Sequence, residues 1–105
     1  KTIQTNYLRG IMLESKIQSK IKKELTKQGW IVLRPVQVSK SGYPDLWCLK
    51  DCQCMFVEVK RPGENPTPLQ ELRHKELREA GFQVIIATSV NCVERIKSAH
   101  AFSGL

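Results

Sequence analysis

No stretch of the 105-residue sequence approaches the roughly 20 consecutive apolar residues that a membrane-spanning helix needs. The sequence also lacks the charged start, short apolar run and small-residue cleavage site of a signal peptide. We therefore expect an intracellular protein with no membrane partner.

Cysteine is sparse, with four residues at Cys48, Cys52, Cys54 and Cys92. In a reducing compartment these are expected to be free thiols rather than a disulfide framework. Cys48, Cys52 and Cys54 have a metal-like spacing, but the second pair of soft ligands that a closed zinc site needs is missing. Zinc is therefore the weaker interpretation.

Acidic residues are also few, with 10 Asp and Glu against 17 Lys and Arg, which gives a net charge of +7. This balance predicts a polyanionic partner, nucleic acid first. A membrane surface is the weaker option, because no basic amphipathic helix with exposed Trp or Phe can be identified. The hydrophobic content of 41% and the charged content of 26% are typical of one small globular domain.

The first part of the chain predicts a helix. Apolar residues recur every four positions from Met12 to Gln28, and Gly29 provides the C-terminal cap. Residues 1–11 show no clear periodicity, so we interpret them as a tag remnant or a flexible N-terminal extension. The single domain is then expected to span residues 12–105.

The rest of the chain predicts strands and two further helices. Strands are expected over 30–38, 45–50, 53–60 and 82–88, with Pro35 indicating an edge or a bulge in the first. A second helix begins at Thr67-Pro68 and runs to about Ala80, and a third covers 89–99. The predicted fold is α/β, in the order α-β-β-β-α-β-α, with helices flanking a mixed sheet.

Three charged residues converge at one end of the expected hairpin. If the hairpin turns at residues 51 and 52, Asp45 lies opposite Glu58, and strand alternation puts Lys60 on the same face. Opposed carboxylates repel each other, and a divalent cation with oxygen ligands would compensate them. Such a cation can activate water for phosphodiester hydrolysis. The alternative is a turn residue followed by the solvent face of an edge strand.

The motif residues and their surroundings resemble those of a known family. GYPDLW at 42–47 and MFVEVKRPGENPTPLQ at 55–70 resemble the VRR-NUC nucleases, a branch of the PD-(D/E)xK superfamily with a restriction-endonuclease-like core. The resemblance runs from about residue 14 to residue 87. It implies a catalytic centre of Asp45, Glu58 and Lys60, with Mg²⁺ or Mn²⁺ held by both carboxylates and the main-chain carbonyl of Val59.

The resemblance extends to two further residues, each with an alternative use. Glu14 corresponds to the first-helix glutamate that many of these nucleases add to the catalytic metal site, and it lies on the core-facing side of its helix. As a first-turn acid it could instead interact with the helix dipole. Gln70 matches a glutamine that follows the motif lysine and could orient water or phosphate in catalysis. It also fits a capping box with Thr67.

The residues around the motif are predicted to form a DNA-binding surface. Basic residues lie along the first helix and are spread over neighbouring elements, Arg34 among them, although such a stripe is often only a solvated face. The candidate DNA ligands are Lys16 and Lys20 on the helix, Ser39, Lys40, Ser41 and Tyr43 before the motif, and Arg61 after it. His74, one turn after Gln70, is a candidate proton carrier, with a surface residue as the more common use.

The expected function is Mg²⁺- or Mn²⁺-dependent endonucleolytic hydrolysis of structured DNA, without an organic cofactor. Short members of the family resemble Holliday-junction resolvases that cut four-way junctions as homodimers, in the cytoplasm of a bacterium or a phage-infected host. Trp30, Trp47 or Phe102 could form the dimer contact or belong to the core. The alternatives are a flap- or restriction-like nuclease and a non-catalytic DNA-binding module of the same fold.

Overall fold

A computed structural model describes residues 2–94 of the chain. The elements are α1 (Thr2–Lys27), β1 (Ile31–Leu33), β2 (Leu46–Lys50), β3 (Gln53–Val59), α2 (Pro68–Glu79) and β4 (Gln83–Ala87). Residues 90–94 form a further helical segment. The predicted order is thus confirmed, while the remainder of the expected third helix and Phe102 lie outside the described residues. None of the helices described combines the length and the apolar character needed to cross a bilayer.

The sheet has the strand order β1-β2-β3-β4, with β3 and β4 parallel and the other neighbours antiparallel. In the hairpin, Leu46 pairs with Val57 and Lys50 pairs with Gln53. Asp51 and Cys52 have φ angles of 50° and 62°, which is the left-handed backbone of a tight two-residue hairpin turn. The predicted turn and register are therefore confirmed.

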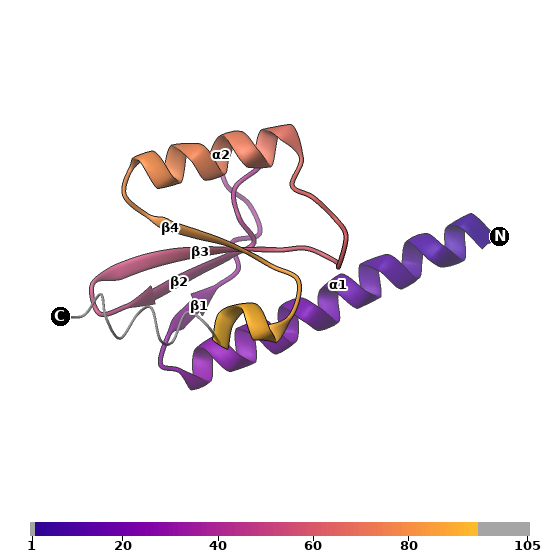
Figure 1. Cartoon of the computed structure of the whole chain (residues 1–105), viewed down its shortest axis with the longest axis horizontal. Coiled ribbons are helices and arrows are strands. Elements are labelled where there is room, and N and C mark those ends of the chain that lie inside the picture. Colours follow the sequence, from indigo (N-terminus) through magenta and orange to yellow (C-terminus); the bar gives the residue numbers. More distant parts are fainter. Residues whose placement is uncertain (1, 95–105) are drawn as a thin grey trace.

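The two helices cover opposite faces of the sheet (Figure 1). The main core lies on the face of α1, where helix side chains such as Ile21 and Leu25 join Met55, Val57 and Val59 of β3 in one buried cluster. Trp30 belongs to this cluster and is only 4% exposed, so it is a core residue rather than a surface contact. This face provides most of the apolar burial that stabilises the fold.

The neighbouring positions of β3 point to the other face, toward α2. There Phe56 makes edge-to-face contacts with Trp47 and Phe82, each with ring centroids 5.6 Å apart. Two buried polar residues, Glu58 and His74, share this side of the molecule. The face under α2 is therefore a small mixed core, partly aromatic and partly polar.

Two predicted boundaries are wrong. The first helix begins at Thr2 rather than Met12, and its N-terminal end projects beyond the sheet (Figure 1). A helical end that packs on little of the domain needs no apolar periodicity, which is why the pattern missed it.

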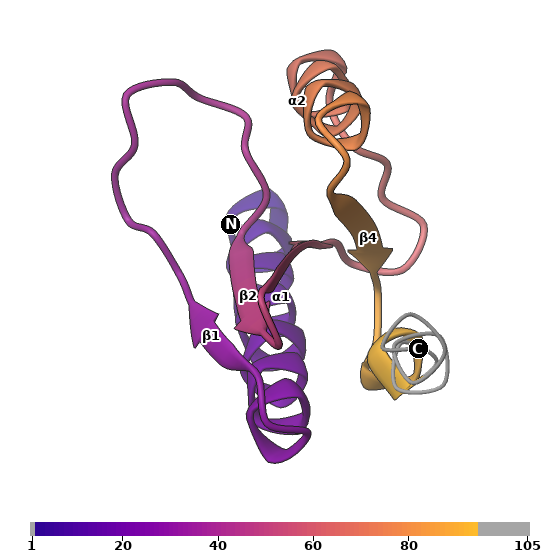
Figure 2. The same cartoon turned by 90° about the vertical axis from the view of Figure 1, so that its left-hand side faces the viewer.

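The second wrong boundary is the end of the first strand, which stops at Leu33 instead of residue 38. Its last partner is Trp47, and Pro35 follows two residues later without an N–H group to donate to the ladder. The chain between β1 and β2 forms a long loop that extends away from the sheet (Figure 2). This loop leads directly into Asp45.

Candidate active site

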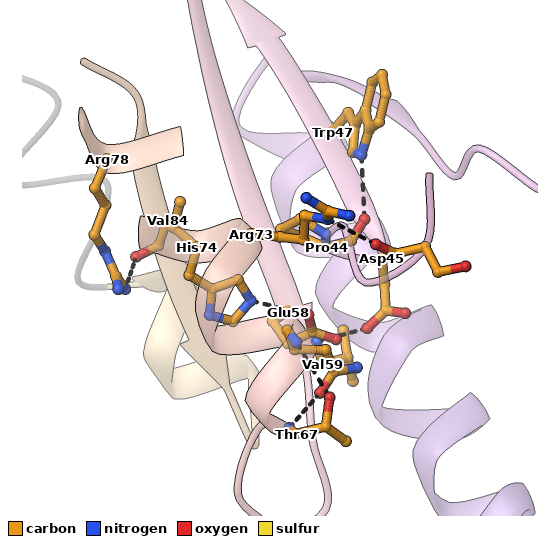
Figure 3. Close-up of polar contacts among 12 residues, drawn as sticks. Pro44, Asp45, Trp47, Glu58, Val59, Thr67, Arg73, His74, Arg78 and Val84 are labelled. Atoms are coloured by element: carbon orange, nitrogen blue, oxygen red, sulfur yellow. Dashed lines mark hydrogen bonds and ion pairs between the residues drawn. The ribbon is translucent and has the colours of Figure 1, made fainter. Parts of the chain in front are cut away.

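The two motif carboxylates meet where β2 begins and β3 ends. Asp45 directly precedes β2, and its Oδ2 accepts a hydrogen bond of 2.9 Å from the main-chain N–H of Val59 (Figure 3). This bond holds the carboxylate at the end of the ladder, next to Glu58, whose residue is only 1% exposed. The structure thus brings together the pair that the hairpin register predicts.

The buried pair perturbs its own protonation. Burial, the hydrogen bond with Asp45 and the negative charge of Asp45 together raise the pKa of Glu58 to about 8. Lys60, 7% exposed and directly beyond the strand, counteracts this by lowering the pKa of Glu58. Ionising both carboxylates would leave more negative charge than Lys60 can balance, so an additional cation would favour the ionised pair.

Glu14 faces the same region from α1. Because the helix begins twelve residues earlier, Glu14 is not a first-turn acid, and the helix-dipole interpretation is wrong. Burial raises its pKa, as do the negative charges of Glu64 and Asp45, whereas Lys60 lowers it. Glu14 therefore lies within electrostatic reach of the motif residues.

A cleft opens between α1 and the β1–β2 loop beside these carboxylates. Its volume is about 270 Å³, and its lining consists of Ile11, Glu14, Ser15, Gln18, Arg34 and Asp45. The lining combines acidic oxygens with a guanidinium, an amide and a hydroxyl that can donate hydrogen bonds. Sequence reasoning named Arg34 only among scattered basic residues and missed Ser15 and Gln18, which lie on the same side of the helix as Glu14.

The donors at this site fit a hard divalent cation. Within residues 2–94, no three His, Cys, Asp or Glu side chains are already grouped as a metal site. The nearby donors are the carboxylates of Asp45 and Glu58 and the carbonyl of Val59, with Glu14 on the facing helix. Mg²⁺ and Mn²⁺ prefer such oxygen ligands and leave part of their shell to water and substrate. A cation here would also offset the repulsion that raises the pKa of Glu58.

His74 is the site residue that the sequence interpretation misjudged. It is 1% exposed rather than on the surface, and its Nε2 lies 3.0 Å from Oε1 of Glu58 (Figure 3). Burial lowers the pKa of His74, and the charges of Arg78 and Lys60 lower it further, which favours a neutral imidazole. The sequence did contain a signal for this burial, because His74 lies three residues before half-buried Leu77 and so on the same face of the helix.

Gln70 takes part in the cap of α2. Its backbone N–H donates to Oγ1 of Thr67 at 3.2 Å, and its side-chain Oε1 accepts from the backbone N–H of Thr67 at 2.9 Å. Both halves of a capping box are therefore present. The capping alternative is confirmed, and a catalytic role of Gln70 stays a prediction.

Several candidate DNA ligands already have protein partners. The hydroxyl of Tyr43 donates to Glu76 at 3.1 Å, and the carbonyl of Ser41 accepts from Nε of Arg73 at 2.9 Å. Between them Gly42 has a φ of 92°, and a Cβ there would lie 2.8 Å from the side chain of Leu69. These contacts dock the loop against α2 and so position the residues before Asp45.

The remaining basic and polar candidates differ in their distance from the cleft. Arg61 forms an ion pair of 2.8 Å with Glu64 beside α1, while Ser39 and Lys40 are exposed on the loop. Lys16 and Lys20 are exposed on α1, but neither lines the cleft. Lys20 borders a separate hollow together with Lys23, Glu24, Lys27 and Val90.

Comparison with known proteins agrees with this architecture. The sequence matches the family model of the VRR-NUC domain over residues 6–91. It is 38% identical over 80 residues to the "Putative nuclease p44" of Acyrthosiphon pisum secondary endosymbiont phage 1, covering 75% of this chain and 86% of that protein. A solved structure described as "VRR_NUC domain" superposes with a TM-score of 0.72 at 29% identity, covering 80% of this chain and 92% of that one. The chain therefore belongs to the VRR-NUC family.

Proposed function

We propose that this protein is a metal-dependent endodeoxyribonuclease of the PD-(D/E)xK type that hydrolyses phosphodiester bonds in structured DNA. The observation that carries the proposal is the buried pair of Asp45 and Glu58 with Lys60 beside it. Burial and the neighbouring carboxylate raise the pKa of Glu58 to about 8, an arrangement that costs stability and that active sites commonly contain. A protein that only bound DNA would gain nothing from carboxylates that repel phosphate.

Each residue of the site has its own role in the proposed reaction. Asp45, Glu58 and the carbonyl of Val59 would hold Mg²⁺ or Mn²⁺, with Glu14 as a further carboxylate from α1. When bound, such a cation polarises the phosphate and lowers the pKa of a coordinated water. Lys60 stabilises negative charge that develops on the phosphate oxygens while water forms the new P–O bond. The attacking water gives up a proton, the P–O bond to the leaving sugar oxygen breaks, and that oxygen takes up a proton.

The substrate is supported by charge and by the cleft. The chain carries a net charge of +7, which attracts a polyanion despite the acidic site. In the cleft, Arg34 can bind a backbone phosphate, and Ile11 offers an apolar surface to a deoxyribose. Lys16, Lys20, Ser39 and Lys40 are exposed on the surrounding surface and would add non-specific attraction.

We further propose that the enzyme is a homodimer that resolves four-way junctions. The projecting part of α1 exposes apolar side chains, with Leu8 at 52% and Met12 at 60% exposure, which is the kind of surface that a second copy can cover. Two sites related by twofold symmetry would face opposed strands of a junction. A restriction-like nuclease and a non-catalytic module of the same fold are the competing functions.

The test compares a synthetic four-way junction with a linear duplex of the same sequence, each with Mg²⁺, with Mn²⁺ and with a chelator. Metal-dependent cleavage of the junction in preference to the duplex is the expected result. Binding without cleavage would overturn the nuclease assignment, whereas equal cleavage of both substrates would overturn only the junction specificity. The molecular mass in solution tests the dimer.

A further inference from the structure

We infer that His74 is a positioning residue that orients the carboxylate of Glu58 toward the metal and the substrate. This inference rests on the proposed function, because it concerns how the same site is built. The sequence suggested His74 only as a proton carrier, and not as a partner of Glu58. The argument comes from burial and hydrogen bonding in the layer between β3 and α2.

The contact between the two residues is buried on both sides. Nε2 of His74 and Oε1 of Glu58 are 3.0 Å apart, and each side chain retains only 2% of its exposure. A buried carboxylate needs hydrogen-bond donors, because losing water without replacement costs about 1–3 kcal/mol or more. When Glu58 is ionised to bind a metal, the Nε2–H tautomer of His74 can donate to it and fix one oxygen of the carboxylate. The Glu58 side chain also hydrogen-bonds with Asp45, so it is held between α2 and the motif aspartate.

The helix that carries His74 is capped at its start and attached to β4 toward its end. At its start, the capping box of Thr67 and Gln70 satisfies the first-turn N–H groups. Toward its end, Nη2 of Arg78 donates to the carbonyl of Val84 in β4 at 3.0 Å. His74 lies one turn before Arg78, so this attachment of the capped helix helps to hold its imidazole against β3.

The same helix also holds the loop that leads to Asp45. Arg73 donates to the carbonyl of Ser41 at 2.9 Å, and its guanidinium lies 5.2 Å from the ring centroid of Tyr43. Adjacent residues of α2 therefore act on the two carboxylates: Arg73 through the loop before Asp45, and His74 directly on Glu58. Helix α2 therefore sets the position of the Glu58 carboxylate relative to that of Asp45.

If His74 positions Glu58 in this way, removing its hydrogen bond should weaken metal binding. Partners that hydrogen-bond to metal ligands typically change metal affinity by about 10- to 100-fold when they are removed. His74→Phe keeps a planar apolar side chain of similar size but has no donor, whereas His74→Gln keeps an N–H donor. If His74 served only as packing, Phe would be the better tolerated replacement. If it orients Glu58, Gln would be.

The experiment titrates Mn²⁺ and Mg²⁺ into the purified wild type, His74→Phe and His74→Gln by calorimetry, without DNA. The metal dependence of junction cleavage and the thermal midpoint of each protein are measured in parallel. We expect His74→Phe to bind metal about 10- to 100-fold more weakly and to need correspondingly more metal for cleavage. His74→Gln should remain within about threefold of the wild type.

The outcomes separate this inference from the proposed function. Wild-type affinity in a folded His74→Phe, or an equal loss in His74→Gln and His74→Phe, would overturn the positioning role and leave the nuclease assignment intact. A wild type that neither binds the metals nor cleaves would overturn both. If His74→Phe does not fold, His74→Gln decides alone, because retained affinity supports the role and a tenfold loss overturns it.

Discussion

The two faces of β3 differ in what they bury. On the face of α1, Met55, Val57 and Val59 pack in an apolar cluster. On the face of α2, Phe56 is followed by Glu58, which is 1% exposed and contacts a buried histidine instead of an apolar side chain. One strand thus presents stabilising residues to one helix and ionisable residues to the other.

This difference indicates a division between stability and chemistry. Burying a carboxylate beside a second carboxylate disfavours its charged form, as the raised pKa of Glu58 shows. The fold tolerates this cost because the opposite face of the same strand is filled with apolar contacts. Substitutions on the two faces are therefore expected to separate activity from stability, and the predictions below test that separation.

The largest effect is expected on catalysis from the face of α2. Glu58→Gln removes a proposed metal ligand, and Lys60→Ala removes the cation that stabilises developing charge, so each should reduce junction cleavage by about 100-fold or more. Cleavage assays with Mg²⁺ and binding assays with a chelator measure the two properties separately. Near wild-type cleavage by either variant would place the chemistry elsewhere.

Val57→Ala is the matched control on the other face of β3. Val57 is fully buried in the apolar cluster, so the substitution should lower the free energy of unfolding by about 2 kcal/mol. The folded fraction should cleave at the wild-type rate. A variant of Val57 that loses cleavage without losing stability would contradict the separation of the two faces.

The next largest effect is expected on the free energy of unfolding of the metal-free protein, which should depend on pH. Burial and Asp45 raise the pKa of Glu58 to about 8 from an ordinary value of 4.5, so the folded state keeps a proton that the unfolded state releases. The associated stability is present below the unfolded pKa and is lost as pH rises through the folded pKa. The loss is on the order of a few kcal/mol. Urea unfolding at pH values across this window measures it.

Glu58→Gln provides the control for this pH dependence, because the amide does not titrate in the window. Its stability should change less with pH than that of the wild type, and Mg²⁺ should stabilise the wild type more than the variant at the alkaline end. Identical pH profiles for the two proteins would show that Glu58 does not hold the proton.

A smaller effect is expected for DNA binding at the cleft. Arg34→Ala should weaken junction binding by roughly tenfold and reduce the salt dependence by about one released ion, because it removes one phosphate contact. Lys23→Ala is the matched control, since Lys23 borders hollows on other sides of α1 rather than the cleft. If Lys23→Ala weakened binding more than Arg34→Ala, the lysine stripe rather than the cleft would hold the DNA.

The smallest effect concerns the cap of α2. Gln70→Ala and Thr67→Ala each break the capping box and should lower the free energy of unfolding by about 1 kcal/mol. If Gln70 only caps the helix, the two variants should show the same small change in cleavage. A much larger cleavage defect in Gln70→Ala, at equal stability, would establish the catalytic role that the family resemblance implies.

Much of the site could be predicted because it depends on local rules. A two-residue turn at Asp51 and Cys52 fixes the register of a hairpin, and the register alone places Asp45 beside Glu58. The cap at Thr67 and the helix end at Gly29 also follow from local backbone preferences. The start of α1 and the end of β1 could not be predicted in this way, because no repeat of apolar residues marks either boundary.

The sequence by itself determined the hairpin, the motif pair and the order of the elements, because strand alternation, turn geometry and helix caps act over a few residues. Only the tertiary structure decided which helix faces meet the pair. The packing of α2 on β3 turned His74 from an expected surface residue into the buried partner of Glu58. The packing of α1 placed Glu14, Gln18 and Arg34 around one cleft. Contacts between distant segments depend on how whole elements pack, which no local pattern encodes.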